Sequence, residues 1–342
     1  MSKGTLQQNP FAKLLAVARE VSFVRGAELV RQGEASRGAY LIRSGTCEAR
    51  VALPGGGAMT VANFGAEDMF GEMALLERGV VSATVVATAN LDGWFVGRDD
   101  FRAIVASREA KALDVQRAIT KILADKLRTL NVRIQEYPAV EDPPEVGEVP
   151  TADPLSSVKR SRQVSFDWKA FLPVLPFFEG FDAHEMDELA SLGKVIELPR
   201  GAWVFAAGLA ASAAFLVVRG ALEVFTRSDG KERRVAIAGP GELVGYVALI
   251  RGAPHGGNAR VREACCLLEI PRAGFMEIYE GNSGATVRLH HAIHRSLMRA
   301  LAQTNTQLTR LISHARLTDS TRKAEELEAA LAGQVVRAEV PG

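Results

Sequence analysis

The stretch Phe70-Gly71-Glu72-Met73-Ala74-Leu75-Leu76 decides the fold, because a related stretch occurs a second time further along the chain. The later stretch reads Gly245-Tyr246-Val247-Ala248-Leu249-Ile250. The glycine and the apolar residues recur in the same order and at the same spacing, whereas Tyr246 stands where the first stretch has Glu72. Self-similarity at a fixed offset is the sequence signature of a repeated structural unit.

The similarity extends to both sides of these stretches. Pairs of matched residues keep a constant separation along each side, and a single one-residue insertion or deletion joins the two sides. The matched pairs include Gly33 with Gly208, Gly45 with Gly220, Arg98 with Arg272, Phe101 with Phe275, Leu123 with Leu297, and Leu127 with Leu301. A match of this length with one gap indicates a duplication, and 342 residues are enough for two domains.

The duplication sets the predicted domain limits. We predict a first domain over residues 1–137, a linker over 138–163, a second domain over 164–314 and a C-terminal tail over 315–342. The linker carries prolines at positions 138, 143, 144, 150 and 154 together with many charges, which predicts an extended, mobile tether. Its basic run, which ends at Ser165, is also compatible with a docking or phosphorylation site.

Short β-type runs separated by turn residues open each copy. The runs are 39–43, 47–53 and 59–64 in the first copy, and 214–218, 222–226 and 234–238 in the second. Several short strands at this spacing predict a barrel or jelly roll. The predicted fold class is therefore mainly β with flanking α, with two β-roll barrels that are each followed by a long C-terminal helix.

Each copy then changes to a helical period with an apolar seam. The seam residues are Leu123, Leu127, Leu130, Ile134 and Tyr137 in the first copy, and Leu297, Leu301, Thr304, Leu308 and Leu311 in the second. Their 4-3-4-3 spacing is typical of a helix that packs along one face. The partner of this seam is either its own barrel or the identical helix of another chain, and we favour a homodimer through the seam helices.

Composition narrows the function classes. The net charge is +1, so the basic excess that phosphate-backbone binding needs is absent, and nucleic acid is not favoured as a partner. Cys47, Cys265 and Cys266 are too few and too badly spaced for a disulfide framework or a zinc site. With no signal-peptide stretch at the N-terminus and no apolar run long enough to span a membrane, we expect a cytoplasmic protein.

The stretch 70–76 resembles the phosphate-binding cassette of the cyclic-nucleotide-binding domain family, which includes the catabolite activator protein and the tandem domains of the protein kinase A regulatory subunit. The resemblance covers roughly residues 11–137 and 171–312. It implies a short helix that points backbone N–H groups at a cyclic phosphate, an arginine that donates to that phosphate, and a glutamate that accepts the ribose 2′-hydroxyl.

The first copy retains only part of that pattern. The residues that the resemblance assigns to a first ligand pocket are Gly71, Glu72, Met73, Ala74, Ser82, Ala83 and Thr84. Glu72 occupies the ribose position, but Val81 stands at the arginine position and offers the phosphate no hydrogen bond. Losing a charge-assisted hydrogen bond of about 1.5–3 kcal/mol weakens binding by about one to two orders of magnitude. Arg78 is a nearby alternative donor.

The second copy departs further. Its assigned pocket residues are Gly245, Tyr246, Val247, Ala248, His255 and Gly256. Tyr246 replaces the glutamate and His255 replaces the arginine, so a neutral imidazole offers one donor where an arginine offers a fork. Either the pocket is remodelled for another ligand, such as a nucleoside or a cyclic dinucleotide, or Tyr246 plugs it.

The remaining motifs give no sign of catalysis. His290, His291 and His294 lie on one predicted helix, but no third zinc ligand is close in sequence, so we interpret them as a solvated or dimer-seam cluster. Too few residues follow the second seam helix for the DNA-reading domain that many relatives carry.

We therefore predict a non-enzymatic regulatory adaptor without a metal or cofactor. It would sense a nucleotide-like ligand (cAMP, a nucleoside or a cyclic dinucleotide) weakly or non-canonically, best in the first pocket, and act through an unidentified partner protein. The alternatives are a ligand-free scaffold with vestigial pockets and a regulatory subunit of an enzyme in trans.

Overall fold

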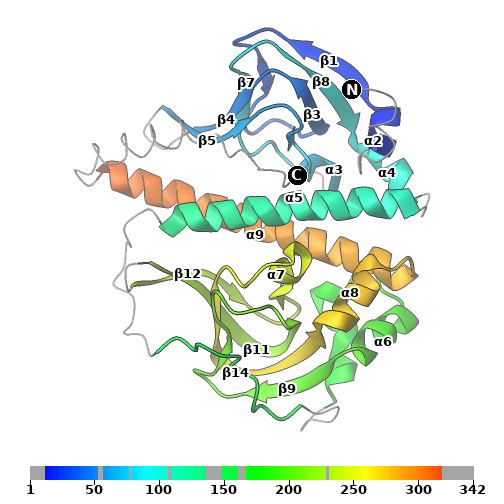
Figure 1. Ribbon diagram of the computed structural model, residues 1–342, viewed down its shortest axis with the longest axis vertical. Helices are drawn as coiled ribbons and strands as arrows, with labels where there is room; N and C mark the ends of the chain where they lie inside the picture. Colours follow the sequence, from blue (N-terminus) through cyan, green and yellow to red (C-terminus); the bar gives the residue numbers. More distant parts are fainter. Residues whose placement is uncertain are drawn as a thin grey trace. The chain divides into compact units, whose positions relative to one another are not determined.

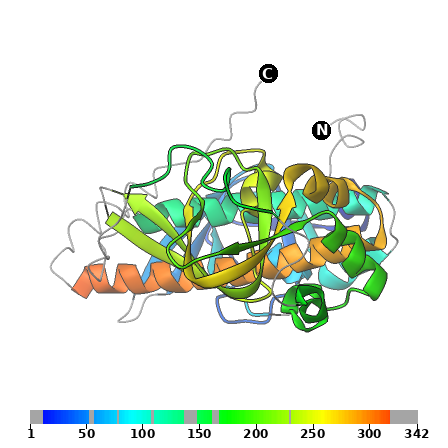
Figure 2. The same ribbon diagram turned by 90° about the horizontal axis from the view of Figure 1, so that it is seen from below.

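The computed structural model describes residues 12–52, 57–76, 79–106, 110–135, 148–160, 167–228 and 231–317 (Figures 1 and 2). These residues divide into two compact units, with boundaries at 118/119 and 308/309. Both boundaries fall inside long helices, α5 (Ala110–Gln135) and α9 (Gly284–Leu317). The second half of α5 therefore belongs to the same compact unit as the second β-roll.

The first β-roll consists of two four-stranded antiparallel sheets with the strand orders β1-β8-β3-β6 and β2-β7-β4-β5. The strands are β1 (Arg19–Phe23), β2 (Glu28–Val30), β3 (Gly38–Ser44), β4 (Cys47–Ala52), β5 (Ala58–Phe64), β6 (Met69–Phe70), β7 (Thr84–Ala87) and β8 (Leu91–Gly97). The helices are α2 (Ala12–Val17), α3 (Met73–Leu76) and α4 (Arg98–Ala106), followed by α5. Its core residues include Ile42, Phe70, Val85 and Leu91.

The second β-roll is a six-stranded antiparallel sheet with the order β10-β14-β11-β12, in which β13 pairs with β11 and β9 pairs with β14. The strands are β9 (Lys194–Leu198), β10 (Trp203–Phe205), β11 (Ala213–Ser228), β12 (Lys231–Ala238), β13 (Leu243–Val244) and β14 (Asn258–Pro271). The helical elements are the 3₁₀ turns η1 (Trp168–Val174) and η2 (Pro176–Phe178), then α6 (Ala183–Ser191), α7 (Tyr246–Arg251), α8 (Arg272–Glu280) and α9. The predicted fold class is thus confirmed, although the runs 214–218 and 222–226 form one continuous strand.

The duplication is visible in the backbone at two glycines. Gly45 and Gly220 have φ angles of 89° and 87°, a left-handed conformation that side chains with a Cβ disfavour. A Cβ at Gly45 would lie 2.1 Å from the carbonyl oxygen of Asn90, and one at Gly220 would lie 2.3 Å from that of Ala264. Both positions therefore require glycine, because neither the φ angle nor the space admits another residue.

Part of the predicted linker packs into the second β-roll. Leu155 is 2% exposed and belongs to the same core cluster as Phe215 and Leu267. Arg160 donates from Nε and Nη2 to the carboxylate of Glu269, at 2.6 and 3.0 Å. The prediction of a mobile tether is therefore wrong for residues 155–160, because a buried leucine and a forked ion pair hold them. Residues 136–147 and 161–166 lie outside the described residues, and the domain limits themselves stay a prediction.

The seams of α5 and α9 are buried within one chain. In the second unit, Leu123, Ile134 and Leu297 are each fully buried. The two helices also meet through polar side chains, because Thr120 Oγ1 lies 2.6 Å from His294 Nε2 and Thr304 Oγ1 donates to Asn131 Oδ1 at 3.5 Å. The homodimer stays a prediction, but these three seam residues are already buried within the chain.

Within the described residues, no helix combines the length and the apolar character needed to span a lipid bilayer.

Candidate functional site

The turn from β13 into α7 forms one wall of the candidate site. Gly245 caps α7 with φ +81°, a conformation that lets the chain leave the strand and start the helix at once. A Cβ here would lie 3.1 Å from the carbonyl oxygen of Ala213 and 3.5 Å from His255 Cε1. The glycine therefore allows the helix to start close to the strand β11 and to His255.

The backbone shows that Val81 and His255 occupy equivalent positions. The N–H of Gly33 donates to the Val81 carbonyl at 2.9 Å, and the N–H of Gly208 donates to the His255 carbonyl at the same distance. Val81 N–H in turn donates to Glu34, and His255 N–H donates to Leu209. Both residues thus stand where the family resemblance places an arginine, and neither repeat has one there.

Tyr246 is buried but does not fill the site. Its side chain is 4% exposed, and its hydroxyl donates to Ser296 Oγ on α9 at 3.2 Å. Burial raises the pKa of the Tyr246 phenol, so it stays protonated at neutral pH. A cavity of about 350 Å³ remains beside it, so the alternative in which Tyr246 plugs the pocket does not describe this structure.

His255 is a flat, uncharged part of the wall. Its ring stacks on Phe205, with 4.1 Å between the ring centroids and an interplanar angle of 8°. Burial lowers the pKa of His255 from 6.5 to about 4. The imidazole is therefore neutral at pH 7, and it gives the cavity an aromatic face without a positive charge.

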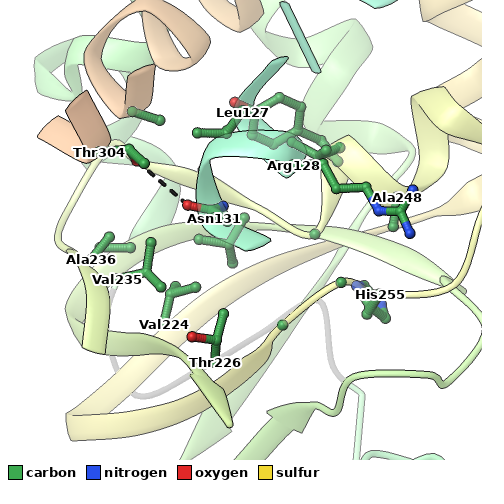
Figure 3. Close-up of a pocket in the computed structure, with 18 of the residues that line it drawn as sticks. Leu127, Arg128, Asn131, Val224, Thr226, Val235, Ala236, Ala248, His255 and Thr304 are labelled. Atoms are coloured by element: carbon green, nitrogen blue, oxygen red, sulfur yellow. Dashed lines mark hydrogen bonds between the residues drawn. The ribbon is translucent and has the colours of Figure 1, made fainter. Parts of the chain in front are cut away.

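The cavity lies in the second unit between the β-roll and two helices (Figure 3). All six residues predicted for the second pocket line it: Gly245, Tyr246, Val247, Ala248, His255 and Gly256. Strands β11 and β12 contribute Val224, Thr226 and Ala236. Its volume is in the range of small-molecule sites, about 300–1,000 Å³, and its wall is mainly apolar with a few polar groups, as such sites usually are.

The two long helices also contribute residues to the cavity, and the sequence pattern does not predict them. Leu127, Arg128 and Asn131 of α5 line the cavity, as do Ser296 and Thr304 of α9. A dimer seam was the role expected of these helices, so their polar residues had no function in that interpretation. The duplication itself was the available signal, because two similar seams in one chain can pair with each other.

Two of the arginines in the cavity wall are paired with carboxylates. Arg251 Nε lies 2.5 Å from Asp125 Oδ1, which joins α7 to α5. Arg299 Nη1 lies 3.1 Å from Glu242 Oε1, which joins α9 to the turn before β13. These pairs connect the helices to the β-roll around the cavity.

We expect the burial of His255 to make the protein less stable in acid. A base whose native pKa lies below its unfolded value is protonated first in the unfolded chain, so the free energy of unfolding is highest above pH 6.5 and falls as the pH drops towards 4. The slope for one such proton is at most about 1.4 kcal/mol per pH unit. Burial, with Arg288 and Arg295, also lowers the pKa of His291, which acts in the same direction.

Urea denaturation at pH 7, 6 and 5 measures this slope. In the variant His255→Asn we expect a shallower dependence than in the wild type, because one of the titrating groups is gone. An unchanged slope in the variant would show that His255 does not carry the effect.

The first pocket is built on the turn between β6 and α3. Gly71 has φ +75°, and Glu72 is 1% exposed. Arg98 fixes this turn, since its Nε donates to the Ala74 carbonyl at 2.5 Å and its Nη2 donates to the Ser36 carbonyl at 2.7 Å. The residues Met73, Ser82, Ala83 and Thr84 lie at the same turn or at the start of β7. Their role in ligand binding stays a prediction, and Arg78 lies outside the described residues.

The histidines of α9 are packing groups. His290 and His294 are 0% and 4% exposed, so the interpretation as a solvated cluster is wrong for these two, while the dimer-seam alternative stays a prediction. His290 Nε2 lies 3.0 Å from the carbonyl oxygen of Tyr279, and its ring stacks on that tyrosine. In the part of the chain that the structure describes, no three His, Cys, Asp or Glu side chains form a group that could hold a metal ion.

Comparisons with known proteins identify the family of the chain. The sequence model of the cyclic nucleotide-binding domain matches residues 20–108 and 195–282, which together make up more than half of the chain. The cAMP-dependent protein kinase regulatory subunit of Mycosarcoma maydis is 23% identical over 261 residues, which cover 73% of this chain and 40% of that protein. The cyclic AMP receptor protein of Thermus thermophilus is 31% identical over 104 residues, which cover 30% of this chain and 48% of that protein.

Among solved structures, the regulatory domain of Toxoplasma gondii protein kinase A with cAMP is similar. It is 20% identical to this chain with a TM-score of 0.30, and the match covers 81% of this chain and 93% of that one. The chain spans less than half the length of the two curated relatives.

Proposed function

Because the chain belongs to the cyclic nucleotide-binding domain family, we propose that it is a non-enzymatic regulatory adaptor that binds a nucleotide-like ligand in the cavity of its second β-roll. The observation that carries the proposal is the cavity itself. It has the size of a small-molecule site, and it is lined by the cassette residues and by both long helices. The sequence alone favours the first pocket, whereas this cavity favours the second.

The chemistry of the wall favours a purine-like ring. His255 and Phe205 present a stacked aromatic surface, and Val224 and Ala236 add apolar surface from the strands. A heterocyclic base gains stacking and apolar contact on such a surface. The missing glutamate and arginine of the cassette argue against cAMP bound in the manner of the family, because Tyr246 offers no carboxylate to a ribose hydroxyl.

A ligand in this cavity would act on α5 and α9 together. Leu127 and Asn131 of α5 and Ser296 and Thr304 of α9 face the same space, so an occupant contacts both helices and the cassette helix α7. A ligand that binds one arrangement of these helices better than another shifts the population towards it. We propose that a partner protein senses this shift. An enzyme regulated in trans is our preferred partner, since a relative that matches 73% of this chain is a kinase regulatory subunit by name.

A ligand titration tests the proposal. The purified chain is titrated with adenosine, guanosine, cAMP, cGMP and a cyclic dinucleotide, while the midpoint of thermal unfolding is followed. A ligand at 100 times its Kd adds about 2.7 kcal/mol to the free energy of unfolding, which is a clear rise in the midpoint. No rise with any of the five compounds would contradict a ligand function and favour the scaffold.

A further inference from the structure

The charges around the cavity do not balance. Three arginines line it, and two of them are paired, Arg251 with Asp125 and Arg299 with Glu242. The third, Arg128, forms no hydrogen bond or ion pair with any residue that the structure describes. His255 adds no positive charge at pH 7, because burial holds its pKa at about 4. The wall of the cavity therefore carries one positive charge that no carboxylate of the described residues neutralises.

Arg128 is placed to meet a ligand. It lies on α5, is exposed at the cavity wall, and extends from the helix in the direction of Ala248 on α7 (Figure 3). Ala248 belongs to the cassette turn, and His255 lies in the same wall. A guanidinium offers up to five donors in a rigid fork, which suits the oxygens of a phosphate better than any other side chain does.

Arg128 comes from the first repeat, although the cavity that it lines belongs to the second β-roll. In the alignment that pairs Leu127 with Leu301, the position equivalent to Arg128 on α9 is Ala302, which has no charge. The second β-roll therefore has no such cation on its own helix, and the first repeat provides one.

We propose that Arg128 binds an anionic group of the ligand, so that the second cavity takes a phosphate-bearing nucleoside whose charge is held by the helix of the first repeat. This inference rests on the proposed function, because it names the class of ligand for the same cavity. Arg128 would make the cavity prefer nucleotides to nucleosides, whereas the aromatic and apolar wall alone would bind both classes equally well.

The test compares nucleosides with their phosphates by isothermal titration calorimetry on the full chain. The probes are adenosine, 5′-AMP and cAMP, and guanosine, 5′-GMP and cGMP. In the wild type we expect the best phosphate-bearing probe to bind at least about tenfold more tightly than its nucleoside, which is the lower end for a charge-assisted hydrogen bond. In Arg128→Gln the ratio of the nucleoside Kd to the Kd of its phosphate should fall to about one, while the Kd of the nucleoside stays unchanged. Arg128→Lys should retain part of the wild-type ratio.

Lys121→Gln is the matched control. Lys121 is an exposed cation on the same helix that does not line the cavity, so its loss removes the same charge from α5 without touching the site. We expect the wild-type ratio in this variant. An equal loss in Lys121→Gln and Arg128→Gln would overturn the proposal, because it would show a general effect of charge.

The outcomes also separate this inference from the proposed function. If nucleosides bind the wild type and their phosphates bind no better, the function stands and the role of Arg128 is wrong. If the ratio is high but Arg128→Gln keeps it, another group holds the phosphate, and the role of Arg128 is again wrong. If none of the six probes binds the wild type, the inference fails, and the proposed function fails as well unless the cyclic dinucleotide raises the unfolding midpoint.

Discussion

Replacing Ala236 with tryptophan should abolish ligand-dependent stabilisation and lower the affinity for the best nucleotide at least about 100-fold, or about 2.7 kcal/mol. Ala236 lies on β12 opposite Val224, and both line the cavity of the second β-roll. An indole at this position would occupy much of a cavity of about 350 Å³. Because tryptophan is well tolerated in strands, we expect the variant to fold. The measurement is the shift of the unfolding midpoint with nucleotide, together with the Kd.

The duplication supplies a matched control for this substitution. Ala62 is the position of the first repeat that aligns with Ala236, and it lies on β5 of the first β-roll. The variant Ala62→Trp places the same side chain in the other repeat, so we expect it to bind nucleotide like the wild type. The reverse pattern, with binding lost in Ala62→Trp and kept in Ala236→Trp, would assign the ligand to the first pocket and contradict our choice of site.

Replacing Leu297 with alanine should lower the free energy of unfolding by about 2–5 kcal/mol. Leu297 is a fully buried seam residue of α9, and its truncation leaves a cavity where the seam is packed. Urea denaturation monitored by circular dichroism measures the loss. Thr306→Ala, an exposed position on the same helix, should change the free energy by no more than about 0.5 kcal/mol.

The same experiment tests whether the seam pairs within the chain. If the seam pairs within one chain, the stability of the fold does not depend on protein concentration. The wild-type midpoint of urea denaturation should then be the same at low and high concentration. A seam shared between two chains makes the midpoint rise with concentration, because association stabilises the native state by mass action. Such a rise, lost in Leu297→Ala, would restore the homodimer that the sequence predicts.

Much of the fold could be predicted from the duplication. Gly45 and Gly220 are matched positions of the duplication, and the structure gives them nearly the same φ angle. The 4-3-4-3 spacing predicted both long helices. These features depend on local backbone geometry and on periodicity, which a sequence displays directly.

Other features depend on which segments meet in space, and the sequence pattern does not predict these features correctly. The buried Leu155 sits in a stretch whose prolines and charges resemble those of a tether, and only its packing against the core reveals otherwise. Helix α6 was not predicted, although Asp182 and Glu185 form a capping box that marks its start. The prolines and charges around Leu155 therefore gave no sign of its packing, and α6 lies outside the elements that the repeat predicts.

The candidate site also contains residues that the sequence predicts and residues that it does not. The six residues that alignment with the first copy assigns to the second pocket line one cavity, and their role in ligand binding stays a prediction. Arg128 could not be found by that route, because it comes from the other repeat and has no charged counterpart on α9. The neutral charge of His255 also depends on burial, which its sequence position does not show.

The most direct test of this account is a crystal structure of the chain with the nucleotide that raises its unfolding midpoint most. We predict one ligand per chain in the second β-roll, with its base against His255 and Phe205 and its phosphate within hydrogen-bonding distance of Arg128. A nucleotide bound beside Glu72 in the first β-roll, with the second cavity empty, would contradict it.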